Sequence, residues 1–391
     1  KVKQKKMSDV SQNIGEYNSD SGLSFDIEIP DIPIPEPEEE IKSEVEDKVD
    51  VAFKFAFIGA GQGGSRIAEA FHRVGYRKVC AINTAQQDLN TLKLIENKLC
   101  FGEGGAGKDP FKAAKTFSES KEDILDFMRR SFGDSFDRIF VCVGGGGGTG
   151  TGTMIQLVDA AIELQETLGI DVPVGLILSL PKKSEGKKVN ANAATCLGDA
   201  YDLVEKGKVS PLILIDNEKV TKTYPRLAVS KFWETANMSV VGVFHLYNLT
   251  ASKDSTYTSF DSNDFKQVLD SGLIMFGATP VKDWGDQVSL SRAVRDNVKK
   301  GVLSGGVEIS TGNSAGVIVI GGKEQLDTIP ESHLDQAFEQ ISRLMRPNSV
   351  LHRGVYAGDK SGLTVFTMIG GLGSPTSKIK ELEKLGDVQT A

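Results

Sequence analysis

The feature that most constrains this chain is an uninterrupted run of glycine and threonine over residues 144–152. It follows the apolar segment 138–143, which reads as a buried strand, and it precedes a helix-like segment that starts at Thr153. A glycine loop between a strand and a helix presents free backbone N–H groups and the positive helix end at one point, an arrangement that binds phosphate. A flexible linker is the alternative, but linkers seldom stand between a buried strand and an apolar helix. We therefore predict a phosphate-binding loop.

The composition indicates an ordinary globular protein that is long enough for two domains. The chain has 391 residues and a net charge of −8, which argues against a surface that coats nucleic acid. Its four cysteines and four histidines are scattered, which favours buried thiols and single structural roles over disulfides or a metal site. No apolar run approaches the roughly 20 residues of a membrane span, and no signal peptide is visible. We expect a cytoplasmic protein with no membrane insertion and no direct nucleic-acid partner.

From Phe53 onward, strand-like segments alternate with helix-like ones, which is typical of a parallel sheet with ligands at the carboxyl ends of its strands. A long helix is expected from about Arg226 to Tyr247. The predicted fold class is α/β, with a Rossmann-like parallel-sheet nucleotide-binding domain, a long central helix and a smaller α+β C-terminal domain. The expected boundaries are 1–50 for a disordered acidic tail, 51–225 for the nucleotide-binding domain, 226–250 for the central helix, 251–375 for the C-terminal domain and 376–391 for a short tail, either a charged helix or frayed.

A second glycine motif, residues 59–64, has the G-x-G-x-x-G spacing between a strand and a helix, which suggests dinucleotide binding. An NAD enzyme is nevertheless disfavoured, because residues 82–84 read Ile-Asn-Thr where an acidic residue would hold the ribose. A third glycine loop covers residues 102–110. Three loops of small residues at successive strand ends are expected to converge on one polyphosphate. A P-loop kinase or GTPase is also disfavoured, since no GxxxxGK[ST] motif is present.

Residues 146–152 match GGGTGTG, the signature of the tubulin/FtsZ superfamily, and the chain resembles this family from about Phe53 to Leu372. The other motifs follow in the family's order. They are residues 61–64 for the first phosphate loop, with Gln62 where tubulins carry glutamine, 83–86 for the NTDAQ element, 105–110 for the loop that senses the γ-phosphate, 185–188 for the loop whose glutamate contacts the ribose, and 216–219 for the segment whose asparagine reads guanine.

The resemblance implies a GTPase with GTP or GDP and Mg²⁺ as cofactors. The residues that it assigns to the nucleotide are Gly61, Gln62, Gly63, Ala106, Gly107, Lys108, Gly146, Gly147, Gly148, Thr149, Gly150, Thr151, Glu185, Asn217, Trp233 and Asn237. Trp233 and Asn237 match the family's aromatic-x-x-x-Asn spacing. Positions four apart share a helix face, so a ring can stack on the base while an amide bonds to its edge. Core packing is the alternative for Trp233. The protein ligands of the metal remain unknown.

The resemblance also implies a head-to-tail homopolymer in which an acidic loop after the long helix completes the neighbouring subunit's site. Residues 259–265 resemble the FtsZ pattern NxDxxDV, with Asp261 and Asp264 as the catalytic pair. A carboxylate pair can orient water and hold a cation near the γ-phosphate. In an alternative register Asp264 is the first acid and Gln267 stands at the second, which would remove the catalytic carboxylate. The apolar positions in 265–269 favour the first register.

Four positions depart from the family pattern. Ser259 replaces an asparagine, Ala85 the aspartate of NTDAQ, Val189 an arginine near the ribose and phosphates, and Met238 an aspartate after the base-reading asparagine. These departures predict a divergent member that comes from a phage, a plasmid or a distant cell lineage. A phage protein would act in the host cytoplasm. A non-polymerising nucleotide-dependent regulatory or binding module of the same fold is the alternative function. An adaptor-docking motif, if there is one, is expected near residues 25–34.

Overall fold

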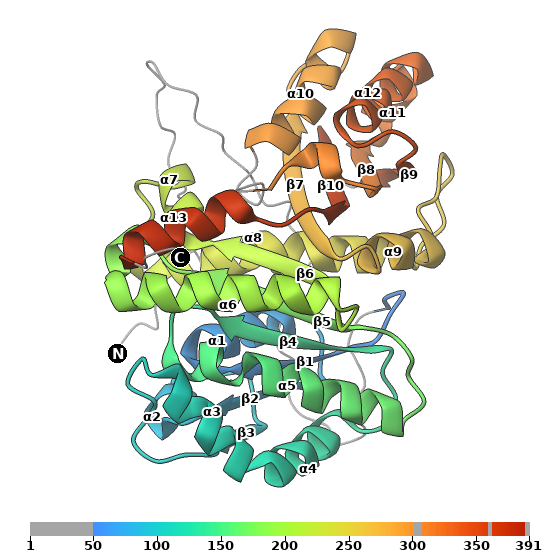
Figure 1. Cartoon of the computed structure of the whole chain (residues 1–391). Helices are drawn as coiled ribbons and strands as arrows, with labels where there is room; N and C mark the ends of the chain where they lie inside the picture. Colours follow the sequence, from blue (N-terminus) through green and yellow to red (C-terminus); the bar gives the residue numbers. More distant parts are fainter. Residues whose placement is uncertain (1–49, 301–306, 359–361, 388–391) are drawn as a thin grey trace, which may run out of the picture.

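The computed structural model of the chain describes residues 50–300, 307–358 and 362–387 (Figure 1). The expected N-terminal tail, with its docking segment, lies outside the described residues, as do the last four positions of the expected C-terminal tail. The strands are β1 (Phe55–Ala60), β2 (Val79–Asn83), β3 (Lys98–Cys100), β4 (Arg138–Gly144), β5 (Val174–Leu180), β6 (Val209–Asp216), β7 (Leu273–Val281), β8 (Ser314–Gly322), β9 (Val350–Gly358) and β10 (Leu363–Leu372).

Helices alternate with the strands through the first half of the chain and continue to its end. They are α1 (Gly61–Arg73), α2 (Gln86–Leu89), α3 (Pro110–Glu119), α4 (Lys121–Phe132), α5 (Gly148–Thr167), η1 (Lys183–Glu185), α6 (Lys187–Glu205), α7 (Asn217–Thr223), α8 (Val229–Thr250), α9 (Ser262–Leu269), α10 (Gln287–Lys300), η2 (Ile309–Thr311), α11 (Lys323–Thr328), α12 (Glu331–Leu344) and α13 (Thr376–Gly386).

One sheet of ten strands passes through the described residues, in the order β3-β2-β1-β4-β5-β6-β7-β10-β8-β9. All neighbours from β3 to β7 run parallel. Strand β10 is antiparallel to both β7 and β8, and β8 and β9 are parallel to each other. The α/β class is therefore confirmed, with a first half in which the sheet is parallel and a smaller second half in which it is mixed.

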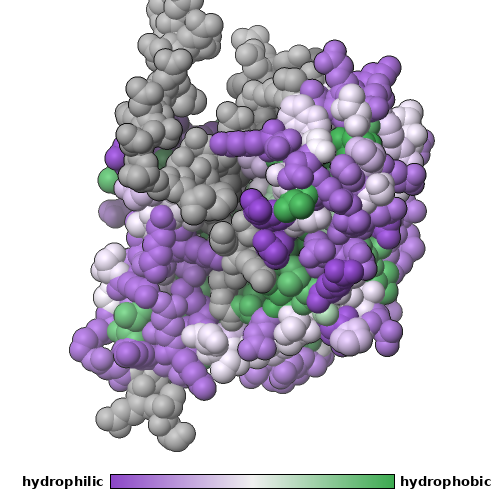
Figure 2. All heavy atoms as spheres, turned by 90° about the horizontal axis from the view of Figure 1, so that it is seen from above, coloured by the Kyte–Doolittle hydropathy of each residue, from purple (hydrophilic) through white to green (hydrophobic). Residues whose placement is uncertain are grey.

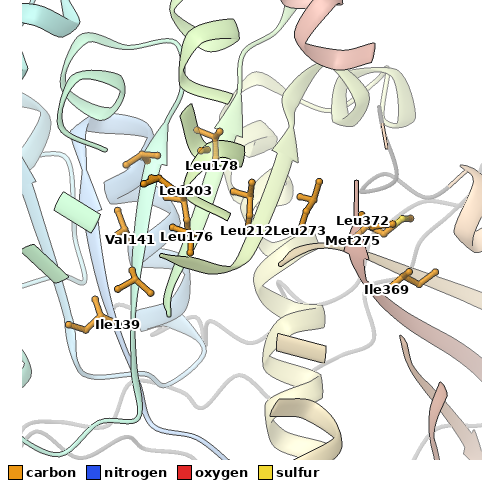
Figure 3. Close-up of a cluster of buried hydrophobic side chains, with 14 of the residues drawn as sticks. Ile139, Val141, Leu176, Leu178, Leu203, Leu212, Leu273, Met275, Ile369 and Leu372 are labelled. Carbon is orange, nitrogen blue, oxygen red and sulfur yellow. The ribbon is translucent and has the colours of Figure 1, made fainter. Parts of the chain in front are cut away.

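Hydrophobic cores cover both faces of this sheet. On one face, side chains from β4, β5, β6, β7 and β10 lie in a continuous row that crosses from the first half of the molecule to the second (Figure 3). On the other face, aromatic rings of β1, β4, α1 and α8 pack together, and the rings of Phe57 and Phe71 are stacked with centroids 3.8 Å apart. Each buried ring contributes about 2–3 kcal/mol. The two halves are thus joined by a shared sheet and a shared core.

Helix α8 connects the first half of the molecule with the second half. The Asn248 amide exchanges hydrogen bonds with the backbone of Phe53, at 2.9 Å and 2.8 Å, just before β1. One residue earlier, the Tyr247 hydroxyl donates to the Gly316 carbonyl of β8 at 2.8 Å. The C-terminal end of α8 is therefore fixed to strands of both halves.

Among the described residues, no helix is long and apolar enough to cross a membrane. The face seen from above is mostly hydrophilic, with hydrophobic residues in small groups (Figure 2).

Candidate nucleotide-binding site

A pocket of about 450 Å³ lies at the carboxyl ends of the parallel strands. Ala60, Asn83 and Gly144, the last residues of β1, β2 and β4, all line it, and Asn217, the first residue after β6, lines it too. This volume falls within the range of about 300–1,000 Å³ of small-molecule sites. The edge of the sheet that the strand–helix alternation predicted is therefore the one that carries the pocket.

All the residues predicted to bind nucleotide line this pocket except Thr151 and Asn237. The Thr151 hydroxyl donates to the Gly145 carbonyl at 2.8 Å, and Asn237 is 6% exposed within α8. Lining a pocket does not test contact with a ligand, so the role of every one of these residues stays a prediction.

The glycine run forms the start of a helix as well as a loop. Helix α5 begins at Gly148, earlier than the start at Thr153 that the apolar pattern predicted. Its N-cap is Gly147, and no side chain caps it. The N–H groups of a first helical turn have no partner within the helix, and here they lie at the pocket together with the positive end of a helix of 20 residues. This end of α5 can bind an anion.

Close packing between loops explains why this run is so rich in glycine. A Cβ on Gly148 would lie 2.8 Å from that of Ala106, and one on Gly150 would lie 2.6 Å from the Gly144 carbonyl oxygen. A Cβ on Gly146 would overlap a methyl group of Val189. Any larger side chain would push the loops apart, so these glycines fix the shape of the pocket wall.

The loop at residues 104–109 is held in an unusual conformation beside α5. Lys108 has a φ of 60°, a left-handed conformation that is uncommon for a residue with a side chain. The Asn192 amide donates to the Lys108 carbonyl at 3.2 Å, and the Lys112 ammonium donates to the Gly105 carbonyl at 2.8 Å. Asp109 caps α3 by accepting hydrogen bonds from its first backbone N–H groups. Contacts with α3 and α6 therefore maintain the strained loop.

Polar side chains form a network on the floor of the pocket. The hydroxyls of Thr84 and Thr149 are 2.8 Å apart. The Asp88 carboxylate accepts from the amides of Asn83 at 3.1 Å and Gln62 at 3.2 Å. Asp88 was missed by the sequence reasoning, although it is an acid three positions after Ala85, where the family carries its aspartate.

A divalent cation would find few protein ligands here. Among the described residues, no group of three or more His, Cys, Asp or Glu side chains is arranged to hold a metal. Asp88 is one of the two carboxylates among the described residues that line the pocket, and two amides already donate hydrogen bonds to it. Mg²⁺ commonly keeps one or two carboxylates and binds otherwise to substrate phosphates and water. The residues present fit a Mg²⁺ that arrives with the nucleotide.

The far end of the pocket is suited to a planar base. Asn217 is 3% exposed, and its Oδ1 is buried without a hydrogen-bond partner. An unpaired buried acceptor costs about 1–3 kcal/mol, which a ligand donor would recover. At the rim, the Arg66 guanidinium lies 5.4 Å from the Trp233 ring centroid and the Lys182 ammonium 5.7 Å. Arg66 also lines the pocket, and sequence reasoning missed it because Arg66 meets Trp233 only in the fold.

The acidic pair lies outside this pocket, at the N-terminus of α9. Asp261 and Asp264 form a reciprocal capping box, in which each carboxylate accepts from the other's backbone N–H at 2.9 Å and 3.2 Å. Asp264 Oδ1 is 2.7 Å from Nδ1 of His352 in β9, a side chain that is 9% exposed. Gln267, the second position of the alternative register, lies in α9 beyond the cap. His352 is a further residue that sequence reasoning did not place.

Helix α8 separates the pocket from the acidic pair. Trp233, near the start of this helix, lines the pocket. Its last residue, Thr250, lies beside Tyr356. The Tyr356 hydroxyl in turn accepts from the N–H of Phe260, the residue before Asp261, at 2.8 Å. Trp233 and Thr250 are 17 residues apart in this helix (250 − 233), which corresponds to about 25 Å along its axis. The acidic pair therefore lies beyond the opposite end of α8 from the pocket of its own chain.

The chain is similar to proteins of known family and structure. Residues 54–225 match the model of the Tubulin/FtsZ family, GTPase domain. The chain is 26% identical over 288 residues to the tubulin-like protein TubZ of Bacillus cereus, and equally to that of Bacillus anthracis, covering 67% of this chain and 64% of each relative.

Solved structures are similar over a longer span. A GTPγS-form protofilament of TubZ from Bacillus thuringiensis superposes with a TM-score of 0.75 at 19% identity, over 87% of this chain and 92% of that one. CetZ2 of Haloferax volcanii, in a GTPγS-bound protofilament, gives a TM-score of 0.69 at 20% identity, over 85% and 98%. At these identities the likeness shows a shared fold.

Proposed function

We propose that this chain, which is a divergent member of the tubulin/FtsZ superfamily, binds and hydrolyses GTP and assembles head to tail into filaments. The observation that carries the proposal is the pocket itself. It combines the start of α5 for phosphates with the unpaired Oδ1 of Asn217 for a base that carries donors.

Each end of the pocket supports one part of the nucleotide. The N–H groups at Gly148 and Thr149 and the ammonium of Lys108 would hold the phosphates, with Mg²⁺ neutralising part of their charge. Glu185 would address the ribose. The N–H donors of guanine match the unpaired acceptor of Asn217, while the Trp233 ring supplies a stacking surface.

The carboxylates of the pocket are poorly placed to activate water, which favours a site completed by a neighbour. Among the described residues that line the pocket, the carboxylates are Asp88 and Glu185. Asp88 accepts two amide hydrogen bonds, and Glu185 accepts from the Lys182 N–H at 2.9 Å. Asp261 and Asp264 stand at the opposite end of α8. A contact that joins opposite ends of two copies extends into a filament when its rotation does not close a ring.

Exposed apolar side chains beside the pocket fit such a contact. Phe111, which begins α3 after the loop that contains Lys108, is 87% exposed, and Val229, at the start of α8, is 91% exposed. A second copy seated over the pocket would cover both. The variants Phe111→Glu and Val229→Glu should therefore abolish GTP-dependent pelleting while leaving nucleotide affinity within about twofold.

The shared site is tested by mixing two inactive variants. Asp264→Ala keeps the pocket and loses the acid, whereas Gly148→Val, which would clash with Ala106, closes the pocket and keeps the acid. Each alone should have little GTP turnover, and the mixture should recover it, because the pocket of one variant then faces the acid of the other. Asp254→Ala, an exposed acid in the same loop, is the matched control and should be fully active.

Turnover by Asp264→Ala at the wild-type rate would contradict the shared-site mechanism. Filaments that contain both variants but remain inactive would contradict it as well. Retained GTP binding with no pelleting in GTP or GDP would instead support a non-polymerising module. Extraction and identification of nucleotide from purified protein tests the choice of base, and bound NAD would refute it.

A further inference from the structure

The C-terminal helix α13 packs on the nucleotide-binding half of the molecule, alongside α6 and close to α7 (Figure 1). We propose that α13 holds the base-reading asparagine in place and that Lys378 is the positioning residue. In this role the helix would set the preference for guanine. The inference rests on the proposed function, because it takes Asn217 as the residue that reads the base.

Lys378 is buried and paired, unlike an ordinary surface lysine. Its side chain is 6% exposed, and its ammonium lies 2.7 Å from Asp216 Oδ2 and 3.2 Å from Glu381 Oε2. Burying an ammonium is costly unless charged partners satisfy it, so this geometry is specific. The contact connects α13 with the residue that directly precedes Asn217.

Asp216 transmits this contact to the base-reading residue. Its Oδ2 binds Lys378, while its Oδ1 caps α7 by accepting from the N–H groups of Glu218 at 3.1 Å and Lys219 at 3.4 Å. Asn217 is the first residue of α7, between the cap and those donors. The orientation of the Asn217 amide in the pocket therefore depends on a carboxylate whose other oxygen is held by α13.

Two further contacts place α13 against the same end of the pocket. Glu381 lies 2.6 Å from the ammonium of Lys183, in the short helix that also contains Glu185, the predicted ribose ligand. Near the end of α13, a Cβ on Gly386 would lie 2.8 Å from the Cα of Ala191, so the helix touches the backbone of α6. The helix thus supports the predicted base and ribose segments together.

Lys219 makes a clean test possible. Burial, together with the charge of Lys378, lowers the pKa of Lys219 to about 8, against the opposing effect of Asp216. Its ammonium is therefore still mostly charged at neutral pH and close enough to sense Asp216. When Lys378 is replaced, Lys219 can keep Asp216 ionised and the α7 cap intact, so that only the connection to α13 is lost.

The experiment compares Lys378→Met with Lys380→Met, an exposed lysine on the same helix. Affinities for GTP and ITP are measured by calorimetry. ITP lacks the 2-amino group of guanine, so it offers one donor fewer to Asn217. We expect wild type and Lys380→Met to prefer GTP by about fivefold or more, and Lys378→Met to lose most of that preference while its ITP affinity changes less than twofold.

The outcomes separate the inference from the function on which it rests. If wild type binds GTP and ITP equally, base reading by Asn217 is refuted. If wild type discriminates and Lys378→Met discriminates equally well, the role of α13 is refuted, and equal weakening of both nucleotides would mean only a structural role. Should Lys378→Met fail to fold, Glu381→Gln removes one of the two charged partners of the Lys378 ammonium and leaves it paired with Asp216, and the same affinity ratio decides.

Discussion

Gly152 provides a stringent test of how the glycine run works, because it belongs to the signature yet does not line the pocket. It lies in α5 where that helix crosses the start of α3. A Cβ at this position would lie 2.8 Å from the carbonyl carbon of Pro110, and closer still to its oxygen. The substitution Gly152→Ala therefore has to displace the backbone of α3, which no side-chain rotation can relieve.

The size of the effect follows from two opposing contributions. Alanine in a helix interior is favoured over glycine by about 1 kcal/mol. Inserting a methyl group into a well-packed contact costs about 1–3 kcal/mol, and a contact with backbone belongs at the upper end. We expect Gly152→Ala to lose about 1–2 kcal/mol of unfolding free energy. Because Asp109 caps α3, the loop that includes Lys108 should move with Pro110, and GTPγS affinity should fall about tenfold or more.

Gly198 in α6 is the matched control, since a Cβ there would meet no heavy atom within 4 Å. Gly198→Ala should gain about 0.5–1 kcal/mol and leave binding unchanged. Urea unfolding gives the free energies, and calorimetry with GTPγS gives the affinities. If Gly152→Ala were as stable as Gly198→Ala, the packing explanation would be refuted. If it lost stability but bound normally, the coupling between α3 and the phosphate loop would be refuted.

Three further predictions concern single side chains. Burial, with a smaller contribution from Lys253, lowers the pKa of His245 to about 4. As the pH falls, the unfolded state therefore takes up the proton first, so stability that is present above about pH 6.5 is lost as the pH approaches 4. In urea titrations, His245→Gln should abolish roughly 2 kcal/mol of the difference in unfolding free energy between about pH 7.5 and pH 5. Arg138, buried and paired with Asp270, also donates to the Ser210 carbonyl, so Arg138→Met should cost about 3–5 kcal/mol in the same assay, and a loss under 1 kcal/mol would contradict it. The chain has two tryptophans; with the other replaced by phenylalanine, Trp233 emission should be quenched by saturating GTP, and unchanged emission would contradict base stacking.

The glycine loops that line the pocket could be predicted from the sequence because each is a local pattern. A strand, a glycine loop and a helix follow one another within a few residues, and the ends of parallel strands must meet at one edge. The start of α5 was placed too late for a related reason. Gly150 and Gly152 are poor helix formers in isolation, so the pattern favoured a loop. In the fold these positions belong to the helix, and only a residue without a Cβ fits there, because the backbones of Gly144 and Pro110 lie too close.

The residues that sequence reasoning missed depend on contacts between distant segments. Arg66 reaches the pocket rim because α1 lies beside α8, and His352 meets Asp264 because β9 runs near the start of α9. The 376–391 segment offered a choice between a charged helix and a frayed tail, and a helix is present to Gly386. Its charge pattern did not identify Asp216 as the partner of Lys378, since only the fold brings the two together.

The construction of α8 decides where Asp261 and Asp264 can act. The helix is continuous for 22 residues, and it is fixed near its end through Tyr247 and Asn248 to both halves of the sheet. Bringing the acids to the pocket of their own chain would mean closing the separation of about 25 Å that α8 sets between Trp233 and Thr250, which requires breaking this helix and the core beneath it. The proposed part of these carboxylates in hydrolysis would therefore be played on the nucleotide of another subunit. GTP turnover per subunit should accordingly rise steeply with protein concentration. A rate per subunit that stays constant as the protein is diluted would exclude the pair from catalysis.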